Sequence, residues 1–173
     1  KHLPDNAELA ELSTYWIAAQ ITGEVAGRKR KITIDSGAAG SHISTAAYKK
    51  YFAQHPELYP VTPWQLNDIH VGNGQTFRPK GMILLPLKIN GQEGKHRFAI
   101  TDGLPHEFLL GVSFLRLWKA LVDFDDGWLA FKQSDGTLGS KINVDVTREF
   151  KRVKYAELVL DDDLVVPPFT EVR

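Results

Sequence analysis

A mostly β fold with one or two short helices is what this sequence predicts. Most apolar residues stand in short runs separated by Gly, Pro and Asn, which is typical of strands joined by tight turns. Gly72-Asn73-Gly74 and Asn90-Gly91 are strong hairpin signals. Segments with helical spacing are few and short.

Alternation and turn residues locate the strands of the first two thirds of the chain. Residues 31–34 alternate polar and apolar side chains, the period of a half-buried strand. Gly23 and Gly27 are expected in the connection that precedes this strand. Residues 82–89 are apolar enough for a buried strand. Strands are expected over residues 16–22, 29–34, 69–71, 76–77, 82–89 and 96–100.

Two segments have helical spacing. Residues 45–54 (TAAYKKYFAQ) predict a short helix closed by Pro56, and residues 114–118 (FLRLW) predict a second. A Pro-rich loop is expected over residues 56–63. The later strands are expected over residues 121–124, 128–131, 141–146 and 156–160.

Composition limits the function classes. With 173 residues, of which 43% are hydrophobic and 24% charged, the chain suffices for one self-supporting domain. The 21 basic residues balance the 21 acidic ones, so no net field attracts nucleic acid or an anionic membrane. The absence of Cys excludes disulfides, zinc ribbons and thiol nucleophiles, and it suits a reducing compartment. The sequence has no apolar run long enough to span a membrane, and its His residues do not have the spacing of metal ligands. Together with the charge balance, this means that no metal, cofactor, nucleic acid or membrane is expected.

Residues 34–38 (IDSGA) carry the most chemical information. An apolar strand delivers Asp35 into a turn, which Ser36 can fix by hydrogen bonding and in which Gly37 allows close approach of a ligand. A carboxylate held rigidly and partly desolvated at a strand end suits acid–base chemistry. The same triplet also fits an Asx turn that merely ends a strand.

Two later motifs favour the chemical interpretation. The Gly72-Asn73-Gly74 hairpin follows, and then residues 108–111 (FLLG) lead into a short amphipathic segment and two strands. This ordered set resembles the retropepsins, the retroviral-type aspartic proteases. Their signature is an apolar-apolar-Asp-Thr/Ser-Gly-Ala segment, a glycine-rich flap and an apolar-Leu-Gly segment before a helix. The resemblance covers about residues 16–131.

The resemblance implies a retropepsin-like closed β-barrel, the acid protease fold, that is active as a symmetric homodimer. Aspartic proteases need two carboxylates across one water, and the pair shares a proton because like charges so close do not both ionise. This chain has one Asp-Ser-Gly, since the Asp-Gly pairs at Asp102, Asp126 and Asp135 lack the intervening Ser or Thr. The second catalytic carboxylate is therefore expected from Asp35 of a second copy.

Roles in the catalytic loops carry over to the matching residues. Ser36 matches the position whose hydroxyl bonds across the dimer axis, and Gly37 matches the position whose carbonyl meets the substrate backbone. Ala38 completes the turn. Leu110 and Gly111 match the second motif, where the glycine lets the following helix pack close under the active-site loop.

The glycine-rich hairpin matches the flap. The resemblance assigns residues 69–79 to it, with Val71, Gly72, Asn73 and Gly74 at its tip. A flap closes over the bound peptide and excludes water. Taken without the other motifs, this hairpin also fits an ordinary surface turn.

The sequence departs from many relatives at Ala39, Val112 and Ser113. Many retropepsins carry an acidic residue at the first position and charged residues after the glycine of the second motif. The ion pair that links the two loops is thus missing on both sides. Apolar contact is expected to replace it without loss, since a buried ion pair adds little net stability.

The organisation expected from these motifs has three parts. Residues 1–13 are an N-terminal arm, residues 14–132 the protease domain, and residues 133–173 an extension or linker towards the next polyprotein segment. Residues 165–172 (VVPPFTEV) resemble the segment after the protease in polyproteins of gypsy-type retrotransposons. Lys1 in place of Met fits a piece of a longer chain.

Two charged runs have ordinary explanations. Residues 28–31 (RKRK) fit a solvated hairpin with protective charges better than an RNA contact. Residues 161–163 (DDD) fit a solvated loop better than a cation site, because adjacent carboxylates in an extended chain point in different directions.

The predicted function is an aspartic endopeptidase that processes a Gag–Pol type polyprotein of a gypsy-type LTR retrotransposon. Its partners are a second copy and an extended peptide, and its location is the cytoplasm, in a retroelement polyprotein or virus-like particle. Two alternatives remain open. One is a cellular retropepsin-like protease, such as those attached to ubiquitin-like domains. The other is a non-catalytic dimerisation or peptide-binding module in which Asp35 only caps a turn.

Overall fold

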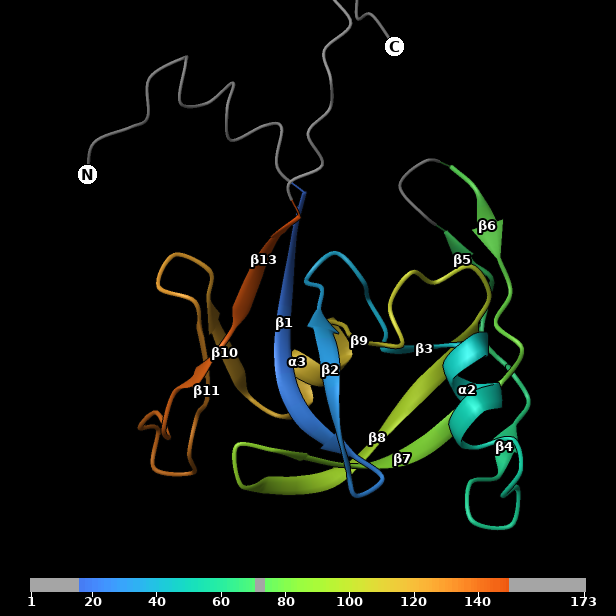
Figure 1. The fold of residues 1–173 in the computed structure, drawn as a ribbon, viewed down its shortest axis with the longest axis horizontal. Coiled ribbons are helices and arrows are strands. Elements are labelled where there is room, and N and C mark those ends of the chain that lie inside the picture. Colours follow the sequence, from blue (N-terminus) through green and yellow to red (C-terminus); the bar gives the residue numbers. More distant parts are fainter. Residues whose placement is uncertain (1–15, 71–73, 150–173) are drawn as a thin grey trace, which may run out of the picture. The chain divides into compact units, whose positions relative to one another are not determined.

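The computed structural model describes residues 16–70 and 74–149. The folded unit runs from Trp16 to Arg148 and is mostly β, as predicted (Figure 1). The expected arm (1–13), the strand expected over 156–160 and the two C-terminal motifs lie outside the described residues. The division of the chain at residues 13 and 132 stays a prediction.

Six strands close into a barrel, which confirms the predicted fold class. Around the ring they follow the order β1, β2, β9, β3, β8 and β7, and β7 pairs with β1 to complete the circle. Closure satisfies the backbone groups that an open sheet leaves at its edges. The strands are β1 (Trp16–Val25), β2 (Arg28–Ile34), β3 (His42–Ser44), β7 (Met82–Ile89), β8 (Gln92–Thr101) and β9 (Phe108–Leu110).

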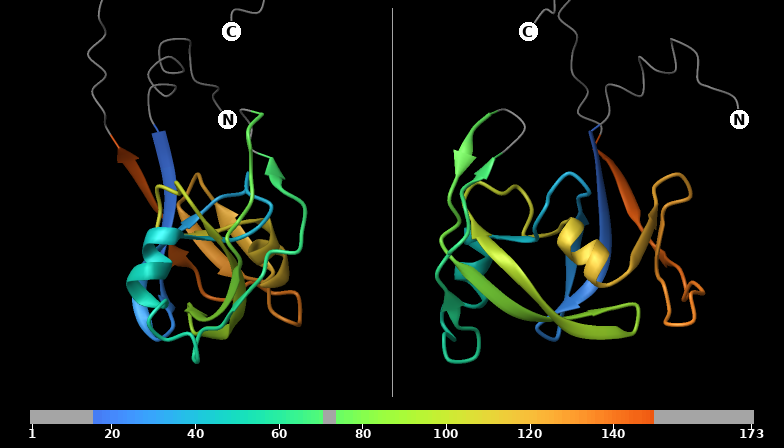
Figure 2. Two further views of the ribbon diagram at one scale, coloured as in Figure 1. Left: turned by 90° about the vertical axis from the view of Figure 1, so that its right-hand side faces the viewer. Right: turned by 180° about the vertical axis from the view of Figure 1, so that it is seen from behind.

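Smaller elements surround this barrel. Strand β4 (Val61–Thr62) pairs with β7, and β13 (Asp145–Glu149) pairs with β1. The β5–β6 hairpin stands beside one end of the barrel (Figure 2). No helix among residues 16–70 and 74–149 has the length or the apolar character to cross a membrane. The remaining elements are β5 (Ile69–His70), β6 (Thr76–Phe77), β10 (Ala120–Asp123), β11 (Trp128–Phe131), β12 (Ile142–Asn143), α2 (Thr45–Tyr51) and α3 (Val112–Leu117).

The hairpin of β1 and β2 turns at Ala26 and Gly27, whose φ angles are 49° and 74°. Such two-residue turns match the twist of the paired strands. The prediction that Gly23 lies in this connection was wrong, because Gly23 is inside β1. A Cβ there would lie 3.0 Å from the side chain of Ile89 and 3.1 Å from that of Ile32. This glycine therefore marks a close approach in the core.

The β7–β8 hairpin is the longest pairing of the barrel. Along β7 buried and exposed residues alternate, as the period of a half-buried strand requires. Asn90 and Gly91 make the predicted turn, with φ angles of 51° and 76°. Strand β8 begins at Gln92 rather than at residue 96, because polar residues of its first half pair with β7 outside the core.

The pairing of β2 with β9 positions the candidate site. The two strands are parallel, with Ile34 opposite Leu110. The chain therefore leaves both strands at the same end of the barrel, at Asp35 and at Gly111. Strand β3 lies on the other side of β9 and continues the sheet to β8.

Both helices were predicted, with different ends. In α2 the side chain of Ser44 caps the first turn by accepting a hydrogen bond from the Ala47 amide at 3.1 Å. This helix ends at Tyr51, three residues before the predicted end.

The single strand expected over residues 141–146 is instead two strands, β12 and β13, interrupted at Val144. Val144 is buried, and its amide donates to the Gly127 carbonyl at 2.8 Å.

Candidate active site

Main-chain hydrogen bonds join the loop after β2 to the loop after β9. The Asp35 amide donates to the Leu110 carbonyl at 3.0 Å. In the opposite direction, the Val112 amide donates to the Ala38 carbonyl at 2.8 Å. The Ser113 amide donates to the Ala39 carbonyl at 3.0 Å. The two loops, called the double loop below (residues 35–41 and 110–113), therefore form one unit.

These bonds show how the loops are linked without charges at Ala39, Val112 and Ser113. That apolar side-chain contact replaces the missing ion pair stays a prediction. The structure links the loops through the amides and carbonyls of this segment. Backbone hydrogen bonds do not depend on side-chain identity, so the link persists without charges at these positions.

Gly111 allows the two loops to approach this closely. A Cβ at this position would overlap the Gly40 carbonyl oxygen and would lie 2.5 Å from the Ala38 carbonyl oxygen. Both contacts are with backbone, which cannot move aside cheaply. Gly111 also precedes the first residue of α3 and acts as its N-cap. The close packing that the sequence assigned to this glycine is thus a contact between main chains.

The carboxylate of Asp35 has a fixed orientation. Its Oδ1 accepts a hydrogen bond from the Gly37 amide at 2.8 Å. The Asp35 carbonyl accepts a longer one from the Ala38 amide at 3.3 Å. Asp35 is half-buried, whereas Ser36 and Gly37 are exposed at the tip of the loop. The structure thus places the predicted catalytic triplet in a turn that fixes the orientation of the Asp35 carboxylate and leaves Ser36 and Gly37 exposed.

A buried polar network supports the double loop from below. Ser41 Oγ accepts a hydrogen bond from the Gly111 amide at 3.1 Å and lies 2.8 Å from His96 Nε2. The His96 ring packs edge-to-face against Phe98 and Phe114. Burial lowers the pKa of His96 to about 4, which keeps the ring neutral. Neither Ser41 nor His96 was a candidate in the sequence, because 55 positions separate them.

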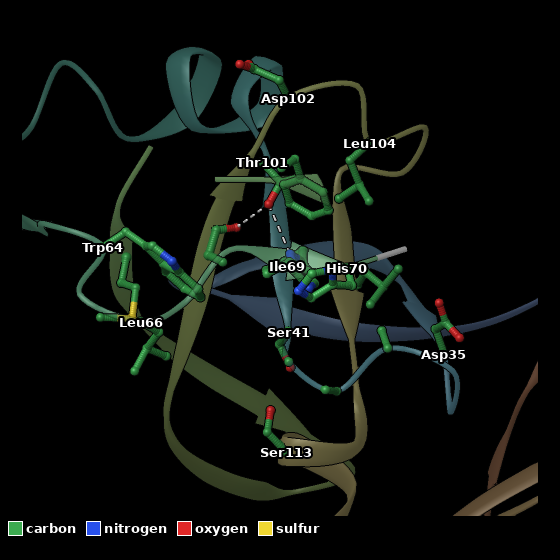
Figure 3. Close-up of a pocket in the computed structure, with 18 of the residues that line it drawn as sticks. Asp35, Ser41, Trp64, Leu66, Ile69, His70, Thr101, Asp102, Leu104 and Ser113 are labelled. Carbon is green, nitrogen blue, oxygen red and sulfur yellow. Dashed lines mark hydrogen bonds between the residues drawn. The ribbon is translucent and has the colours of Figure 1, made fainter. Parts of the chain in front are cut away.

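A cleft of about 1120 Å³ opens beside the double loop. Asp35 lies at one side of it and Trp64 and Leu66 at the other, while Leu104 and Ser113 face it from opposite directions (Figure 3). Its wall is predominantly apolar, as is common in binding clefts. The double loop contributes Asp35, Gly37, Ala38, Ala39, Gly40, Ser41 and Ser113 to this wall.

The predicted flap lies along the same cleft. Ile69, His70 and Phe77 of the β5–β6 hairpin line it. Gly74 has a φ of 80°, the left-handed conformation that favours glycine. Val71, Gly72 and Asn73, three of the four predicted tip residues, lie outside the described residues.

Arg78 fastens the base of this hairpin to the preceding loop. Its Nη1 donates to Asp68 Oδ1 at 2.8 Å, and its Nη2 donates to the Trp64 carbonyl at 3.4 Å. Trp64 Nε1 donates in turn to the Asn67 carbonyl at 3.1 Å. The sequence interpretation missed this loop, although a Trp and a Leu close before a hairpin were an available signal for a binding surface.

The cleft holds one further carboxylate among its described residues, that of Asp102. It lies at the upper edge of the cleft in Figure 3, apart from Asp35. Asp102 Oδ1 pairs with Lys80 Nζ at 2.9 Å. The hydrogen bond from Lys80 lowers the pKa of Asp102, so this carboxylate is ionised and engaged. Asp102 is therefore unsuited to share a proton with Asp35 in the same chain.

The described part of the chain contains no group of three or more His, Asp or Glu residues placed to hold a metal ion. The basic run at residues 28–31 lies in the β1–β2 hairpin, as predicted, with Arg30 stacked over the ring of Tyr51 at 3.8 Å.

No family model matches the sequence, and no curated protein matches it. Solved structures do match. The retroviral protease-like domain of Ddi1 from Leishmania major aligns with a TM-score of 0.53 and 17% identity, over 79% of this chain and 98% of that one. A retropepsin-like aspartic protease from Rickettsia conorii aligns with a TM-score of 0.45 and 23% identity, over 64% of this chain and 86% of that one. The EIAV protease in complex with the inhibitor HBY-793 aligns with a TM-score of 0.47 and 19% identity, over 61% and 91%. The match to the Leishmania domain shows that the barrel of this chain has the retropepsin-like fold.

Proposed function

We propose that this chain is an aspartic endopeptidase that works as a homodimer. The position of Asp35 carries the proposal. Its carboxylate is held by the Gly37 amide at the edge of a large cleft, in a loop joined to a second loop by main-chain bonds. A carboxylate that only capped a turn would not need an apolar cleft beside it. The retropepsin-like fold supports the same conclusion.

The homodimer follows from the count of usable carboxylates. Asp102, the other cleft carboxylate of the described residues, is paired with Lys80. The chain contains one Asp-Ser-Gly triplet. A two-fold axis beside the exposed tip of the double loop would bring a second Asp35 opposite the first. Ser36 would then lie at the axis, where its hydroxyl can bond to the loop of the other copy.

The reaction needs only the two carboxylates and a water. At short separation one Asp35 stays protonated because two negative charges repel each other. The ionised Asp35 takes a proton from the water, and the water oxygen attacks the carbonyl carbon of the peptide. The protonated Asp35 donates its proton to the carbonyl oxygen. The Asp35 that took the water proton then donates it to the nitrogen, the other Asp35 takes a proton from a hydroxyl of the tetrahedral intermediate, and the C–N bond breaks.

The cleft suits an extended peptide as substrate. It runs from the double loop to Trp64 and Leu66, and the β5–β6 hairpin borders it. The Gly37 carbonyl is the group that we assign to the substrate backbone. Residues 69–79 are assigned to a flap that closes over the peptide and excludes water during the reaction.

Within this activity, we assign the substrate to a Gag–Pol type polyprotein. The segment at residues 165–172, which resembles the sequence after retrotransposon proteases, supports this choice. The folded unit also includes β12 and β13, which follow residue 132. A cellular retropepsin-like protease is the second candidate, and the match to the protease-like domain of Ddi1 favours it.

The test is Asp35→Asn in a polyprotein that contains the full chain. Self-cleavage is expected to fall on the order of 10³-fold, because removing a general acid–base costs about that much. Asp126→Asn is the matched control. Asp126 lies in an exposed Asp-Gly turn and is not part of an Asp-Ser-Gly triplet. Undiminished cleavage by Asp35→Asn would refute the proposal. A wild-type chain that stays monomeric at micromolar concentration and binds peptides without cutting them would favour the non-catalytic module.

The domains that flank this chain in the full protein would distinguish the two candidate substrates. A zinc knuckle upstream and a reverse transcriptase downstream would support the retroelement polyprotein. A neighbouring ubiquitin-like domain would support the cellular protease instead.

A further inference from the structure

His42 is a polar side chain in a wall that is otherwise mostly apolar. It begins β3, is buried, and lines the cleft beside the double loop. Its ring lies 6.3 Å from that of Phe77 in the β5–β6 hairpin. A histidine here must find partners for two ring nitrogens, because an unpaired polar atom in such a place is costly.

One ring nitrogen has a partner in the protein. His42 Nδ1 lies 3.0 Å from Thr101 Oγ1, and the Thr101 hydroxyl donates to the Ala99 carbonyl at 3.4 Å. Figure 3 shows both bonds meeting at the Thr101 oxygen. A hydroxyl has one proton, so a Thr101 that donates to Ala99 can only accept from His42. The neutral ring therefore carries its proton on Nδ1, and Nε2 has a free lone pair.

The second ring nitrogen has no partner among the residues that the structure describes. Nε2 lies beside Gly40, another residue of the cleft wall, at 3.8 Å from the place where a Cβ would stand. Gly40 thus leaves the space next to this nitrogen open. An acceptor that faces an open cleft is available to a ligand.

The ring stays neutral near pH 7. Burial lowers the pKa of His42, and the charge of Asp35 raises it by a smaller amount. The dominant form of His42 at that pH is therefore the neutral ring, with its proton on Nδ1 facing Thr101 and a lone pair on Nε2.

We propose that His42 is a specificity-determining residue, whose Nε2 accepts a hydrogen bond from a substrate side chain that carries an O–H or N–H donor. This inference rests on the proposed function, because the substrate is taken to be a peptide in the cleft. The subsite prefers Thr, Ser, Asn or Gln to aliphatic side chains of similar size. Thr101 is a positioning residue, since it selects the tautomer that leaves Nε2 as an acceptor.

The test compares peptides that differ in one atom group. In a positional-scanning library of octapeptides each position is fixed in turn as Thr or as its near-isostere Val. Binding is measured at pH 7 with the full chain carrying Asp35→Asn, so that bound peptides are not cut. One position for each His42 of the dimer, two in all, is expected to favour Thr over Val by about tenfold, because a buried acceptor left unpaired by Val penalises that peptide.

Three variants in the same background assign that preference. His42→Phe keeps the ring but removes both nitrogens, and it is expected to reduce the ratio to about one or below. Thr101→Val removes the oxygen that holds the Nδ1 proton and should also reduce the ratio. His55→Phe is the matched control, because His55 is exposed outside the cleft, and it should leave the ratio unchanged.

A second measurement is made first on the wild-type chain, so its main result does not depend on how the variants fold. The ring nitrogens of His42 in the wild-type chain report the tautomer directly in a ¹⁵N NMR spectrum. The Nδ1–H form is expected, and Thr101→Val should convert it to a mixture. An Nε2–H form in the wild-type chain would overturn the proposal.

The outcomes separate this inference from the proposed function. Cleavage without a Thr preference, or a preference that His42→Phe retains, overturns the role of His42 and leaves the protease intact. A preference that depends on His42, together with no cleavage by the wild-type chain, supports the subsite and refutes the protease. If no position of the library discriminates Thr from Val, the inference is wrong.

Discussion

The double loop and the β5–β6 hairpin border the same cleft but are held in different ways. Main-chain hydrogen bonds, a glycine contact and a buried Ser41–His96 pair secure the double loop. The described part of the hairpin has two residue pairs between its strands, and the exposed side chain of Arg78 fastens its base. Several main-chain bonds together resist opening, whereas exposed ion pairs add little stability.

This difference matches the two tasks that we propose for these regions. An acid–base pair needs a carboxylate fixed within a fraction of an ångström, which the double loop provides. A hairpin that admits and covers a peptide must open at low cost. Four changes test the contrast, and they are ordered here from the largest expected effect on stability to the smallest.

Gly111→Ala should have the largest effect. The added methyl group would overlap the carbonyl oxygens of Gly40 and Ala38, and overpacking against backbone costs about 3 kcal/mol or more. Thermal unfolding is expected to show a large loss of stability, together with loss of activity. Gly40→Ala is the control on the same double loop, since its Cβ would meet only His42 Nε2 at 3.8 Å. Equal stability of these two variants would show that the loops are not packed as described.

Acid should weaken the double loop through His96. The unfolded chain binds a proton near the ordinary pKa of 6.5, whereas burial holds the folded-state pKa at about 4. The unfolded state therefore carries more protons between these values, and the free energy of unfolding falls as the pH drops from 6.5 towards 4. The loss from this group is about 2–3 kcal/mol at the acid end.

Chemical unfolding at pH 7.5 and pH 4.5 checks this, with His96→Gln as comparison. His42, whose pKa burial also lowers, contributes in the same direction in both proteins. The wild-type chain should lose more stability than His96→Gln over this interval. An equal loss in both would mean that His96 already titrates as an exposed histidine does.

Ser41→Ala should cost about 2 kcal/mol, since it leaves the Gly111 amide and His96 Nε2 without their partner. Ser44→Ala removes another buried serine three positions later, which caps α2, and should cost about 1 kcal/mol. Urea unfolding compares the two free energies. Activity should fall with Ser41→Ala beyond its effect on stability, and a larger cost for Ser44→Ala would contradict the importance of the network.

Arg78→Ala should have the smallest effect on overall stability, below about 1 kcal/mol, because the pair with Asp68 is exposed. The effect should be local. Hydrogen exchange at the amides of Ile69, His70, Thr76 and Phe77 is expected to accelerate, while exchange in the double loop stays unchanged. Faster exchange at both places would show that the two regions are not independent.

The barrel could be predicted from the sequence because its signals are local. The apolar composition of residues 82–89 located β7 to the residue, although the strand is half-buried rather than buried, and Asn90-Gly91 marked its turn correctly. Gly23 was misplaced because a glycine signals either a turn or a close approach, and only the folded barrel brings Ile89 against it. Strand β8 was predicted short because its first residues are polar and exposed.

The candidate site could be predicted only in part. The Asp35 turn and Gly111 are short motifs, and the fold brings them together as parallel strand ends. Ser41 and His96 contact each other across 55 positions, and neither belongs to a motif. Arg78 and the loop at Trp64 depend on where the hairpin lies, which no local pattern specifies.

The parallel pairing of β2 with β9 also determines when the site can exist during synthesis. Ser41 and Gly111 are 70 positions apart, so the double loop assembles only after β9 has been made and the barrel has closed. Folds built on such distant strand pairings form in milliseconds to seconds, slower than helical proteins of similar size. A nascent or truncated chain that ends before residue 111 has Asp35 but no double loop. Any proteolysis by this chain therefore begins with a delay, which the topology of the barrel sets.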